Sequence, residues 1–191
     1  MKKLNFDEIK KDVTRYFGVF SWKKLIFGFL FNRTFRPIVT LRLCQQADVA
    51  GWVVFLFIFK IIHGVVCHAA SVDLPWRTSI GAGLKIDHGR GLVVNKNAVI
   101  GSNVTILHGV TIGQKDKILA DGVRVSSYPK VEDLVWIGPN AIIVGGVTIG
   151  KGSRVAGGAF VYEDVPKYSI VAGNPGKVVS SNCIPDVINR A

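Results

Sequence analysis

Cysteine is scarce in this sequence of 191 residues, which holds only Cys44, Cys67 and Cys183. The three lie far apart and form no CxxC pair, so neither a disulfide framework nor a thiolate zinc site is indicated. Such a chain fits a reducing compartment, and we expect a cytoplasmic protein. The first residues do not have the layout of a secretory signal, because Asp7 and Glu8 precede any apolar run.

Acidic residues are also few, since 13 Asp and Glu stand against 24 Lys and Arg and leave a formal net charge of +11. This excess requires an anionic partner, which can be nucleic acid, lipid, polysaccharide or a phosphorylated cofactor. Much of it lies among aromatic and aliphatic residues early in the chain, a mixture that suits a membrane surface better than a DNA groove. We therefore expect no nucleic-acid partner. The early basic residues are Lys2, Lys3, Lys10, Lys11, Arg15, Lys23, Lys24, Arg33, Arg36 and Arg42.

Long apolar runs are missing as well. The longest strongly apolar stretch, AGWVVFLFIF over residues 50–59, ends at Lys60, whereas a helix needs about 20 residues to span a bilayer. We interpret the stretch as a helix that is buried in an oligomer or lies at a membrane interface, and we favour burial in the oligomer.

The first 70 residues predict a helical N-terminal region, with helices over residues 6–20, 22–30, 37–50 and 52–66. Pro37 suits the first turn of its helix, where an amide has no intrahelical partner. Beyond Ser71 the pattern changes to short β-branched runs that are separated by glycine and show no helical period.

A six-residue repeat fills the second part of the chain. Aliphatic residues recur at every sixth position, with a slip of two residues after Ile86 and a longer interruption after Ile112. This pattern, with glycine at the turns, is typical of a hexapeptide β-helix, in which three short strands make one triangular coil. The predicted fold is therefore mainly β, a left-handed parallel β-helix preceded by the helical region. The repeated aliphatics are Ile80, Ile86, Val94, Ile100, Ile106, Ile112, Val131, Ile137, Ile143, Ile149, Val155 and Val161.

We expect the β-helix to span residues 71–179 and a C-terminal tail to follow over residues 180–191. Residues 114–130 are too polar and too numerous for a corner of the coil, so we expect an extended loop there. Long loops on repeat scaffolds often carry function.

Two histidines fall at equivalent places in the repeat. His88 and His108 each lie two residues after a repeated aliphatic, and the 20 residues between them equal one 18-residue coil plus the slip of two. They should occupy the same corner of adjacent coils, about 4.8 Å apart along the axis. His63 and His68 lie in the apolar helical part, where packing is the simpler interpretation.

A histidine of near-neutral pKa can take a proton from an alcohol, best when a carboxylate fixes its tautomer. Asp73 and Asp87 are the nearby carboxylates. His88 is the stronger candidate for the base, because the slip in the repeat makes its corner irregular. His108 remains open between a site residue and a surface residue of the corner.

Five segments closely resemble the serine acetyltransferase branch of the hexapeptide acyltransferases, and the resemblance covers residues 71–179. The closing segment EDVPKYSIVAGNPGKVV resembles that of sugar and xenobiotic acetyltransferases of the same superfamily. The five segments are VDL at 72–74, LKIDHGRGLVVNKNAVIG at 84–101, ILHGVTIG at 106–113, YPKV at 128–131 and VWIGPNAIIVGGVTIG at 135–150.

The resemblance implies roles for the residues of one corner. His88 would be the general base, Asp73, fifteen residues earlier, would orient it, and Asp87 would contact the substrate. The acceptor oxygen would then attack acetyl-CoA directly, without an acyl-enzyme and without a metal. Arg90 and His108 complete the predicted acceptor site around this corner.

The resemblance also predicts where acetyl-CoA binds. The amides of Gly113 and Gln114 would stabilise the oxyanion, because amides of a rigid coil are preorganised. Pantetheine would pass Gly113, Pro139 and Gly157, and Lys177 would meet a phosphate. We expect a homotrimer with this groove between two subunits.

The acceptor is predicted from a difference. Ser127 and Tyr128 stand before Pro129 and Lys130, where serine acetyltransferases have an Arg-His pair that binds serine. With its short N-terminal region and the segment HGVTIG that contains His108, the chain resembles the short acetyltransferases of capsule, colanic-acid and O-antigen clusters. We expect a glycan hydroxyl as the acceptor, with Tyr128 stacking on the sugar and Lys130 nearby, at the inner face of a bacterial inner membrane.

Two alternatives remain, and a third is excluded. Serine O-acetylation is the first, and a non-catalytic hexapeptide scaffold is the second. A γ-class carbonic anhydrase shares the fold but needs three zinc histidines, and the repeat domain has only two. The basic and aromatic N-terminal region either contacts a membrane peripherally or packs within the oligomer.

Overall fold

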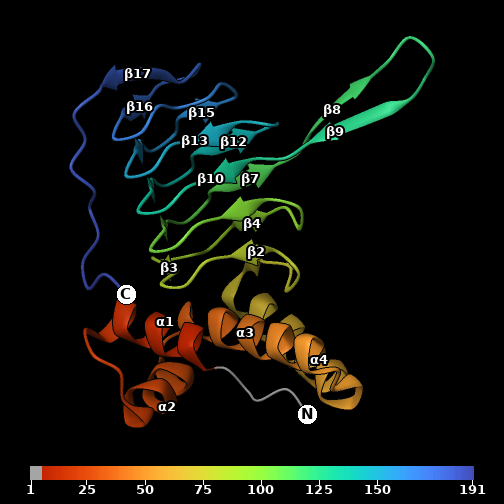
Figure 1. Cartoon of the computed structure of the whole chain (residues 1–191), viewed down its shortest axis with the longest axis vertical. Helices are drawn as coiled ribbons and strands as arrows, with labels where there is room; N and C mark the ends of the chain where they lie inside the picture. Colours follow the sequence, from red (N-terminus) through yellow and green to blue (C-terminus); the bar gives the residue numbers. More distant parts are fainter. Residues whose placement is uncertain (1–5) are drawn as a thin grey trace.

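Four helices form a layer at one end of the molecule, and a triangular prism of strands stands on it (Figure 1). The computed structural model describes residues 6–191, so Lys2 and Lys3 of the basic N-terminus lie outside the described residues. The helices are α1 (Asp7–Phe17), α2 (Trp22–Phe31), α3 (Phe35–Ala50) and α4 (Val53–Ala70).

The prism has three parallel sheets, named A, B and C below. Each full coil passes through sheet B, then sheet C, then sheet A. This is the predicted β-helix with its helical N-terminal region, and the fold prediction is confirmed. Sheet A contains β1 (Val72–Asp73), β4 (Leu92–Val94), β7 (Thr111–Gly113), β12 (Ile142–Val144) and β15 (Phe160–Val161); sheet B contains β2 (Ser79–Ile80), β5 (Val99–Ile100), β10 (Lys130–Val131) and β13 (Thr148–Ile149); sheet C contains β3 (Lys85–Ile86), β6 (Thr105–Ile106), β11 (Trp136–Ile137), β14 (Arg154–Val155), β16 (Ile170–Ala172) and the antiparallel β17 (Lys177–Ser180).

The repeated aliphatics point inward and stack along the axis. All twelve are buried, and the most exposed of them, Ile80, keeps 6% of its surface accessible. Burial of one such side chain stabilises the fold by roughly 1.5–3 kcal/mol. The stacked column therefore supplies a core that repeats from coil to coil.

The helical layer satisfies the open edge of the first coil. Arg42 is 1% exposed and donates to the carbonyl oxygens of Ile80 and Gly81, each at 2.7 Å. Asp12 accepts from Arg42 Nε at 2.9 Å and from the Gly83 amide at 2.7 Å. Burial raises the pKa of the Asp12 carboxyl, and the Arg42 guanidinium opposes this rise. A buried ion pair thus joins α1, α3 and the coil.

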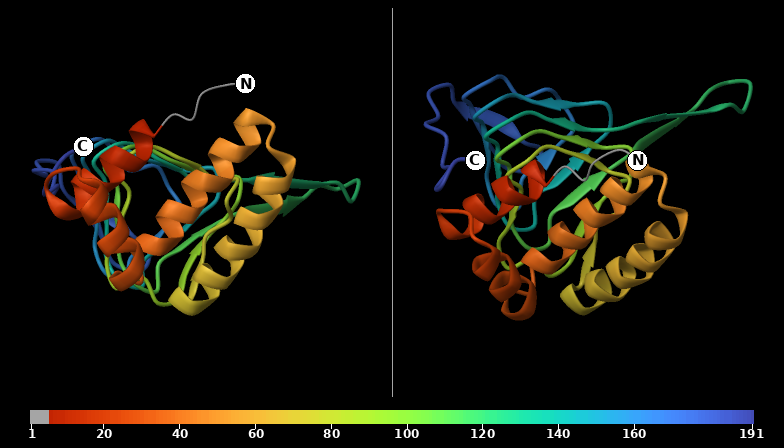
Figure 2. Two further views of the ribbon diagram at one scale, coloured as in Figure 1. Left: turned by 90° about the horizontal axis from the view of Figure 1, so that it is seen from below. Right: turned by 60° about the horizontal axis from the view of Figure 1, so that its bottom comes forward.

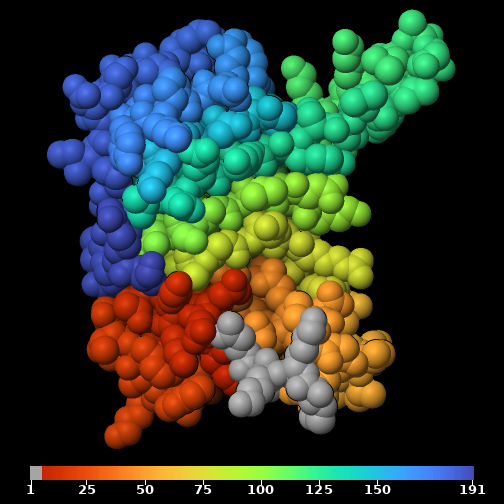
Figure 3. Space-filling view, in the orientation of Figure 1, coloured from red at the N-terminus to blue at the C-terminus, as the bar shows by residue number. Residues whose placement is uncertain are grey.

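Sheet C is protected at both ends. At the lower end the hydroxyl of Tyr16 accepts from the Ile86 amide at 2.8 Å and lies 3.2 Å from the Ile86 carbonyl oxygen. At the upper end β17 pairs with β16. Residues 181–191 then run back along the coil to the helical layer (Figures 1 and 3), where Ala191 and Asn103 exchange hydrogen bonds of 2.8 Å.

The segment predicted as an extended loop is a hairpin for most of its length. Strands β8 (Lys115–Ile118) and β9 (Arg124–Ser127) pair antiparallel and project from the body (Figure 3). The hairpin has no alternating apolar pattern in the sequence, because its cross-strand contacts are polar. Asp116 accepts hydrogen bonds from Ser126 at 2.7 Å and from Arg124 at 3.0 Å.

Two helices end elsewhere than expected. Helix α1 stops at Phe17, because Gly18 adopts the left-handed conformation with φ 80°. Helix α4 continues beyond the predicted residue 66 to Ala70 and ends where Ser71 adopts the left-handed conformation with φ 56°. With 18 residues, α4 is the one helix among residues 6–191 long and apolar enough to cross a membrane by length and composition.

Replacement of Arg42 by methionine should lower the free energy of unfolding by about 3–5 kcal/mol, because Asp12 would remain buried without its counter-ion. Urea denaturation measures this loss. The control is Lys10→Met, which removes an exposed ion pair with Asp7 and should cost less than about 1 kcal/mol. Equal losses in the two variants would contradict the role of Arg42.

Candidate active site

One corner of the prism carries most of the predicted site residues. His88, His108, Pro139 and Gly157 all lie where the chain passes from sheet C to sheet A, one above another in successive coils. Backbone hydrogen bonds join these corners: the Asn140 amide donates to the His108 carbonyl at 2.9 Å, and the Gly158 amide to the Pro139 carbonyl at 2.8 Å. The predicted base and two of the three predicted pantetheine contacts, Pro139 and Gly157, thus share one column.

The lowest corner of the column is irregular, as the slip in the repeat predicted. Ile86 pairs with Ile106, 20 residues on, whereas Val94 pairs with Ile112, 18 residues on, so the corner between them holds two extra residues. His88 lies in this corner with φ 65°, in the left-handed region that non-glycine residues rarely adopt. Backbone strain of this kind clusters at functional sites.

The two histidines face each other across adjacent coils. Their ring centroids are 6.0 Å apart with an interplanar angle of 78°. The Nδ1 atom of His108 is buried and has no hydrogen-bond partner in the part of the chain described. A buried polar atom without a partner is costly, so this nitrogen marks the corner as a candidate functional site.

Asp73 lies beside this corner on sheet A. Its strand pairs with β4, and its exposed carboxylate lines a cavity of about 400 Å³ together with Ser71, Gly91 and His68. No hydrogen bond joins Asp73 to His88 within residues 6–191, so the orienting role stays a prediction.

Asp87 faces the opposite side of the corner. Its carboxylate pairs with Lys85 at 3.4 Å and lines a cavity of about 90 Å³ on sheet C, which Asp186 of the C-terminal tail also borders. Arg90 is exposed and makes no ion pair in the described region. The corner thus presents a carboxylate on either side of His88 and a free cation.

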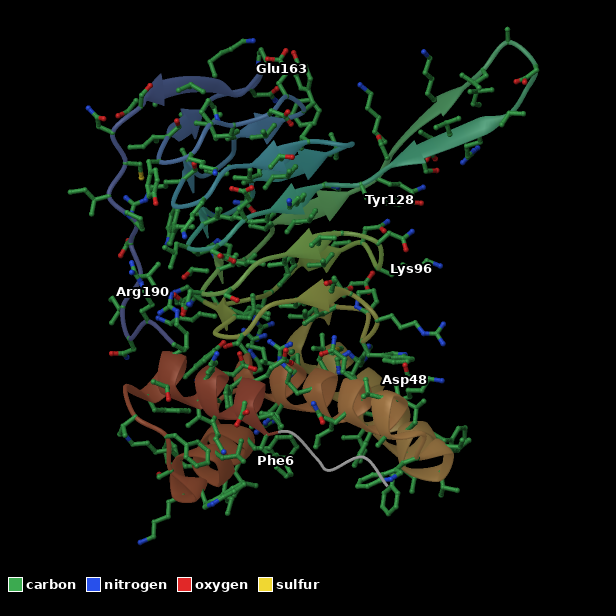
Figure 4. All side chains as sticks on the ribbon, viewed as in Figure 1. Phe6, Asp48, Lys96, Tyr128, Glu163 and Arg190 are labelled. Carbon is green, nitrogen blue, oxygen red and sulfur yellow. The ribbon has the colours of Figure 1, made fainter. Side chains whose placement is uncertain are left out.

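The other predicted residues lie at the corner from sheet A to sheet B. Gly113 ends β7, and Figure 4 places Tyr128 at the base of the hairpin. Gln114 lines a largely apolar cavity of about 490 Å³ that Lys115, Val144, Phe160 and Tyr162 complete. Lys130 lies on sheet B, and Lys177 pairs with Glu163 at 3.6 Å near the far end.

Sheet A separates these two groups within one chain. His88 and His108 lie at the corner where the strands of sheet A begin. Gly113 and Tyr128 lie at the corner where these strands end. A single chain therefore does not bring the predicted base and the predicted oxyanion amides together. Only a neighbouring copy could place the hairpin base of one chain against the histidine corner of another.

The structure adds two residues that the sequence reading missed. Arg33, in the turn between α2 and α3, donates to the carbonyl oxygens of both His88 and Ala70. His68 lines the cavity that contains Asp73. No local motif reveals either residue, because each reaches the corner only through the docking of the helical layer.

The remaining histidine has a structural explanation. His63 is buried, with Nε2 2.7 Å from the Leu74 carbonyl oxygen and Nδ1 2.8 Å from the Thr40 hydroxyl. Burial lowers its pKa. Among residues 6–191 no group of three or more His, Cys, Asp or Glu is arranged to hold a metal ion.

Comparison with known families agrees with this geometry. Residues 128–163 match the bacterial transferase hexapeptide family, described as six repeats, and residues 91–120 match the hexapeptide repeat of succinyl-transferase. Two stretches of the β-helix are thus similar to hexapeptide-repeat transferases.

Within that class, individual relatives are more specific. Serine acetyltransferase 2 of Arabidopsis thaliana is 42% identical over 108 residues, which cover 56% of this chain and 32% of that protein. Serine acetyltransferase of Bacillus subtilis is 36% identical over 128 residues, 67% of this chain and 57% of the relative. The serine acetyltransferase of Brucella abortus in complex with coenzyme A has a TM-score of 0.73 and 28% identity, with 91% of this chain and 67% of that chain covered.

Over the matched residues this chain is similar to hexapeptide-repeat acetyltransferases of the serine acetyltransferase type. The chain spans between about a third and just over half of the length of these two curated relatives. The prediction of a glycan acceptor is contradicted, because the similar proteins at 36–42% identity and the similar structures are serine acetyltransferases. The pair Ser127 and Tyr128 by itself therefore does not indicate a glycan acceptor.

Replacement of Arg33 by methionine should loosen the His88 corner, because two carbonyl oxygens lose a charged donor. We expect amide hydrogen exchange in the peptide covering residues 86–92 to become about tenfold faster, as mass spectrometry can measure. The control, Arg36→Met, removes bonds to Phe29 and Leu30 instead and should leave this peptide unchanged. Unchanged exchange in the Arg33 variant would show that the Arg33 hydrogen bonds do not stabilise the corner.

Proposed function

We propose that this chain is an acetyl-CoA-dependent O-acetyltransferase and that its acceptor is the hydroxyl of free serine. The observation that carries the proposal is the pair of stacked histidines at an irregular corner of a β-helix. Relatives named serine acetyltransferases match over much of this β-helix. The column of corners from sheet C to sheet A holds both the predicted base and predicted contacts of the cosubstrate, and this arrangement suits transfer between two bound substrates.

His88 acts as the general base in this proposal. It takes the proton of the serine hydroxyl while that oxygen forms a bond to the acetyl carbonyl carbon. The carbon–sulfur bond then breaks, and His88 returns the proton to the departing sulfur. The products are O-acetylserine and free CoA. A sulfur leaving group makes direct transfer feasible without a covalent enzyme intermediate.

The residues present fit the cosubstrate, which supplies the activated acetyl group. Beside His108 the column carries no side chain at Gly109. The φ of Gly109 is 67°, and a Cβ at this position would lie 2.0 Å from Asn140 Oδ1. Gly157 extends this narrow surface upward. The apolar cavity beside Gln114 offers space for pantetheine, and Lys115 and Lys177 offer charge for phosphates.

The acceptor site needs one group for each charge of serine. Arg90 is exposed, unpaired in the described region and two residues from His88, so we assign it to the carboxylate. Asp87 is the corner carboxylate that can meet the ammonium, in place of its partner Lys85. Lys130 is a second cation, contributed from the start of β10 in sheet B.

A homotrimer completes the site. The two groups of residues lie at opposite edges of sheet A, and hexapeptide proteins close their interfaces by rotation of identical chains. We assign the histidine corner of one chain and the base of the hairpin of its neighbour to the same site. The amides of Gly113 and Gln114 would then face the developing oxyanion.

The direct test measures CoA release from acetyl-CoA with free serine. The His88→Ala variant should fold normally and lose about 10²- to 10⁴-fold in turnover, the usual contribution of a positioned general base. His63→Gln, a buried histidine outside the site, serves as the control. Absence of CoA release with serine would overturn the acceptor, and near-normal turnover in the His88 variant would overturn the base.

A complementation experiment tests the shared site. His88→Ala and Lys130→Ala chains, each impaired alone, should recover activity when they are refolded together, because a mixed trimer contains one interface with both residues intact. Refolding each variant with itself is the control. Failure of the mixture to exceed the two separate variants would place the whole site within one chain.

A further inference from the structure

Helix α4 exposes an unusually large apolar surface for a helix of a folded domain. Its buried residues are His63, Cys67 and Ala70, which form a narrow stripe. On the remaining face Val53 is 76% exposed and Phe57 65% exposed. Large exposed apolar surfaces mark sites of contact with a protein or a membrane.

Helix α2 adds a second apolar surface to the same layer. Trp22 is 55% exposed and Phe31 72% exposed, with Ile26, Phe27 and Leu30 between them. Figure 2 looks onto the helical layer from below and shows α2 and α4 on the two sides of α3. This face, made of α2 and α4, lies at the end of the prism opposite β17 (Figure 1).

The charges on this face have one sign. Lys23 and Lys24 belong to α2, Lys60 belongs to α4, and neither helix contains Asp or Glu. Aromatic and aliphatic side chains mixed with lysines are typical of helices that lie in the interface of an anionic bilayer. The apolar side chains would enter the headgroup region, and the exposed Lys23 would meet lipid phosphates. The ammonium groups of Lys24 and Lys60 contact the Phe17 carbonyl oxygen and the Trp76 ring, so they would leave these partners to reach lipid.

The same charges disfavour a second copy. Two chains related by a two-fold axis would bring this face against itself, so the lysines of α2 and α4 would meet with no carboxylate from either helix. Desolvated like charges oppose such an interface. An anionic lipid surface has the opposite sign and meets no such penalty.

The packing of α4 shows how the face would lie. The inner stripe is attached to the body through His63, whose ring contacts Thr40 of α3 and the Leu74 carbonyl. Strand β1 begins at Val72, directly after the helix. A helix held in this way lies along a surface rather than across a bilayer, although its length and composition would allow crossing.

We propose that the α2–α4 face docks peripherally onto an anionic phospholipid surface. The proposal is independent of the acceptor, because it rests only on the helical layer. It would hold the β-helix upright on the membrane, with the hairpin directed away from the lipid.

Vesicle sedimentation of the full chain tests the proposal. The protein should pellet with vesicles of phosphatidylcholine and phosphatidylglycerol, bind less to phosphatidylcholine alone, and dissociate as salt screens the charges. Two double variants, Phe27→Glu with Phe31→Glu on α2 and Phe55→Glu with Phe57→Glu on α4, should each lower the partition coefficient at least about tenfold.

The control variant carries Ile118→Glu and Val125→Glu on the hairpin, which exposes apolar residues at a distant place. It should bind vesicles like the unmodified chain. Circular dichroism checks that all variants are folded, and light scattering records their mass. No binding of the unmodified chain to the mixed vesicles, or equal loss in the control, would overturn the proposal. A fall in oligomer mass caused by the α2 or α4 changes would overturn it in favour of a second copy.

Discussion

Parallel pairing between successive coils is the constraint on which this structure depends. Each strand hydrogen-bonds to the strand one coil above, so in the regular coils residues 18 positions apart in sequence occupy the same place on the prism. The inward aliphatics then stack into one core, and the corners stack into columns. The slip of two residues is tolerated at one corner only because the strands on either side keep their pairing, and it leaves His88 in a left-handed conformation.

A stack of this kind has open ends, and the chain uses different devices to close them. At the lower end Tyr16, Asp12 and Arg42 supply side-chain partners to the backbone of the first coil. At the upper end β17 covers the edge of sheet C. The helical layer at the lower end also contacts the candidate site, because Arg33 of this layer donates a hydrogen bond to the His88 carbonyl oxygen. Stability and positioning of the base are therefore coupled in the N-terminal region.

The division of the candidate site follows from the same geometry. A convex prism has no deep cavity, so the residues suited to proton transfer and those suited to oxyanion binding lie at two edges of one sheet. Assembly of identical chains is the simplest way to bring two edges together. The helical layer leaves its own apolar face uncovered at the end of the prism opposite β17.

The sequence by itself determined the β-helix, the shared corner of His88 and His108 and the irregularity beside them, because a six-residue period translates directly into position on a triangular coil. It could not reveal the hairpin, whose cross-strand contacts between Asp116, Ser126 and Arg124 are polar. Tertiary structure alone decided that Asp87 faces sheet C, that Arg33 holds the His88 corner, and that α4 remains exposed. Those features depend on how the helical layer and the C-terminal tail dock against the coil, and docking between distant segments leaves no period in the sequence.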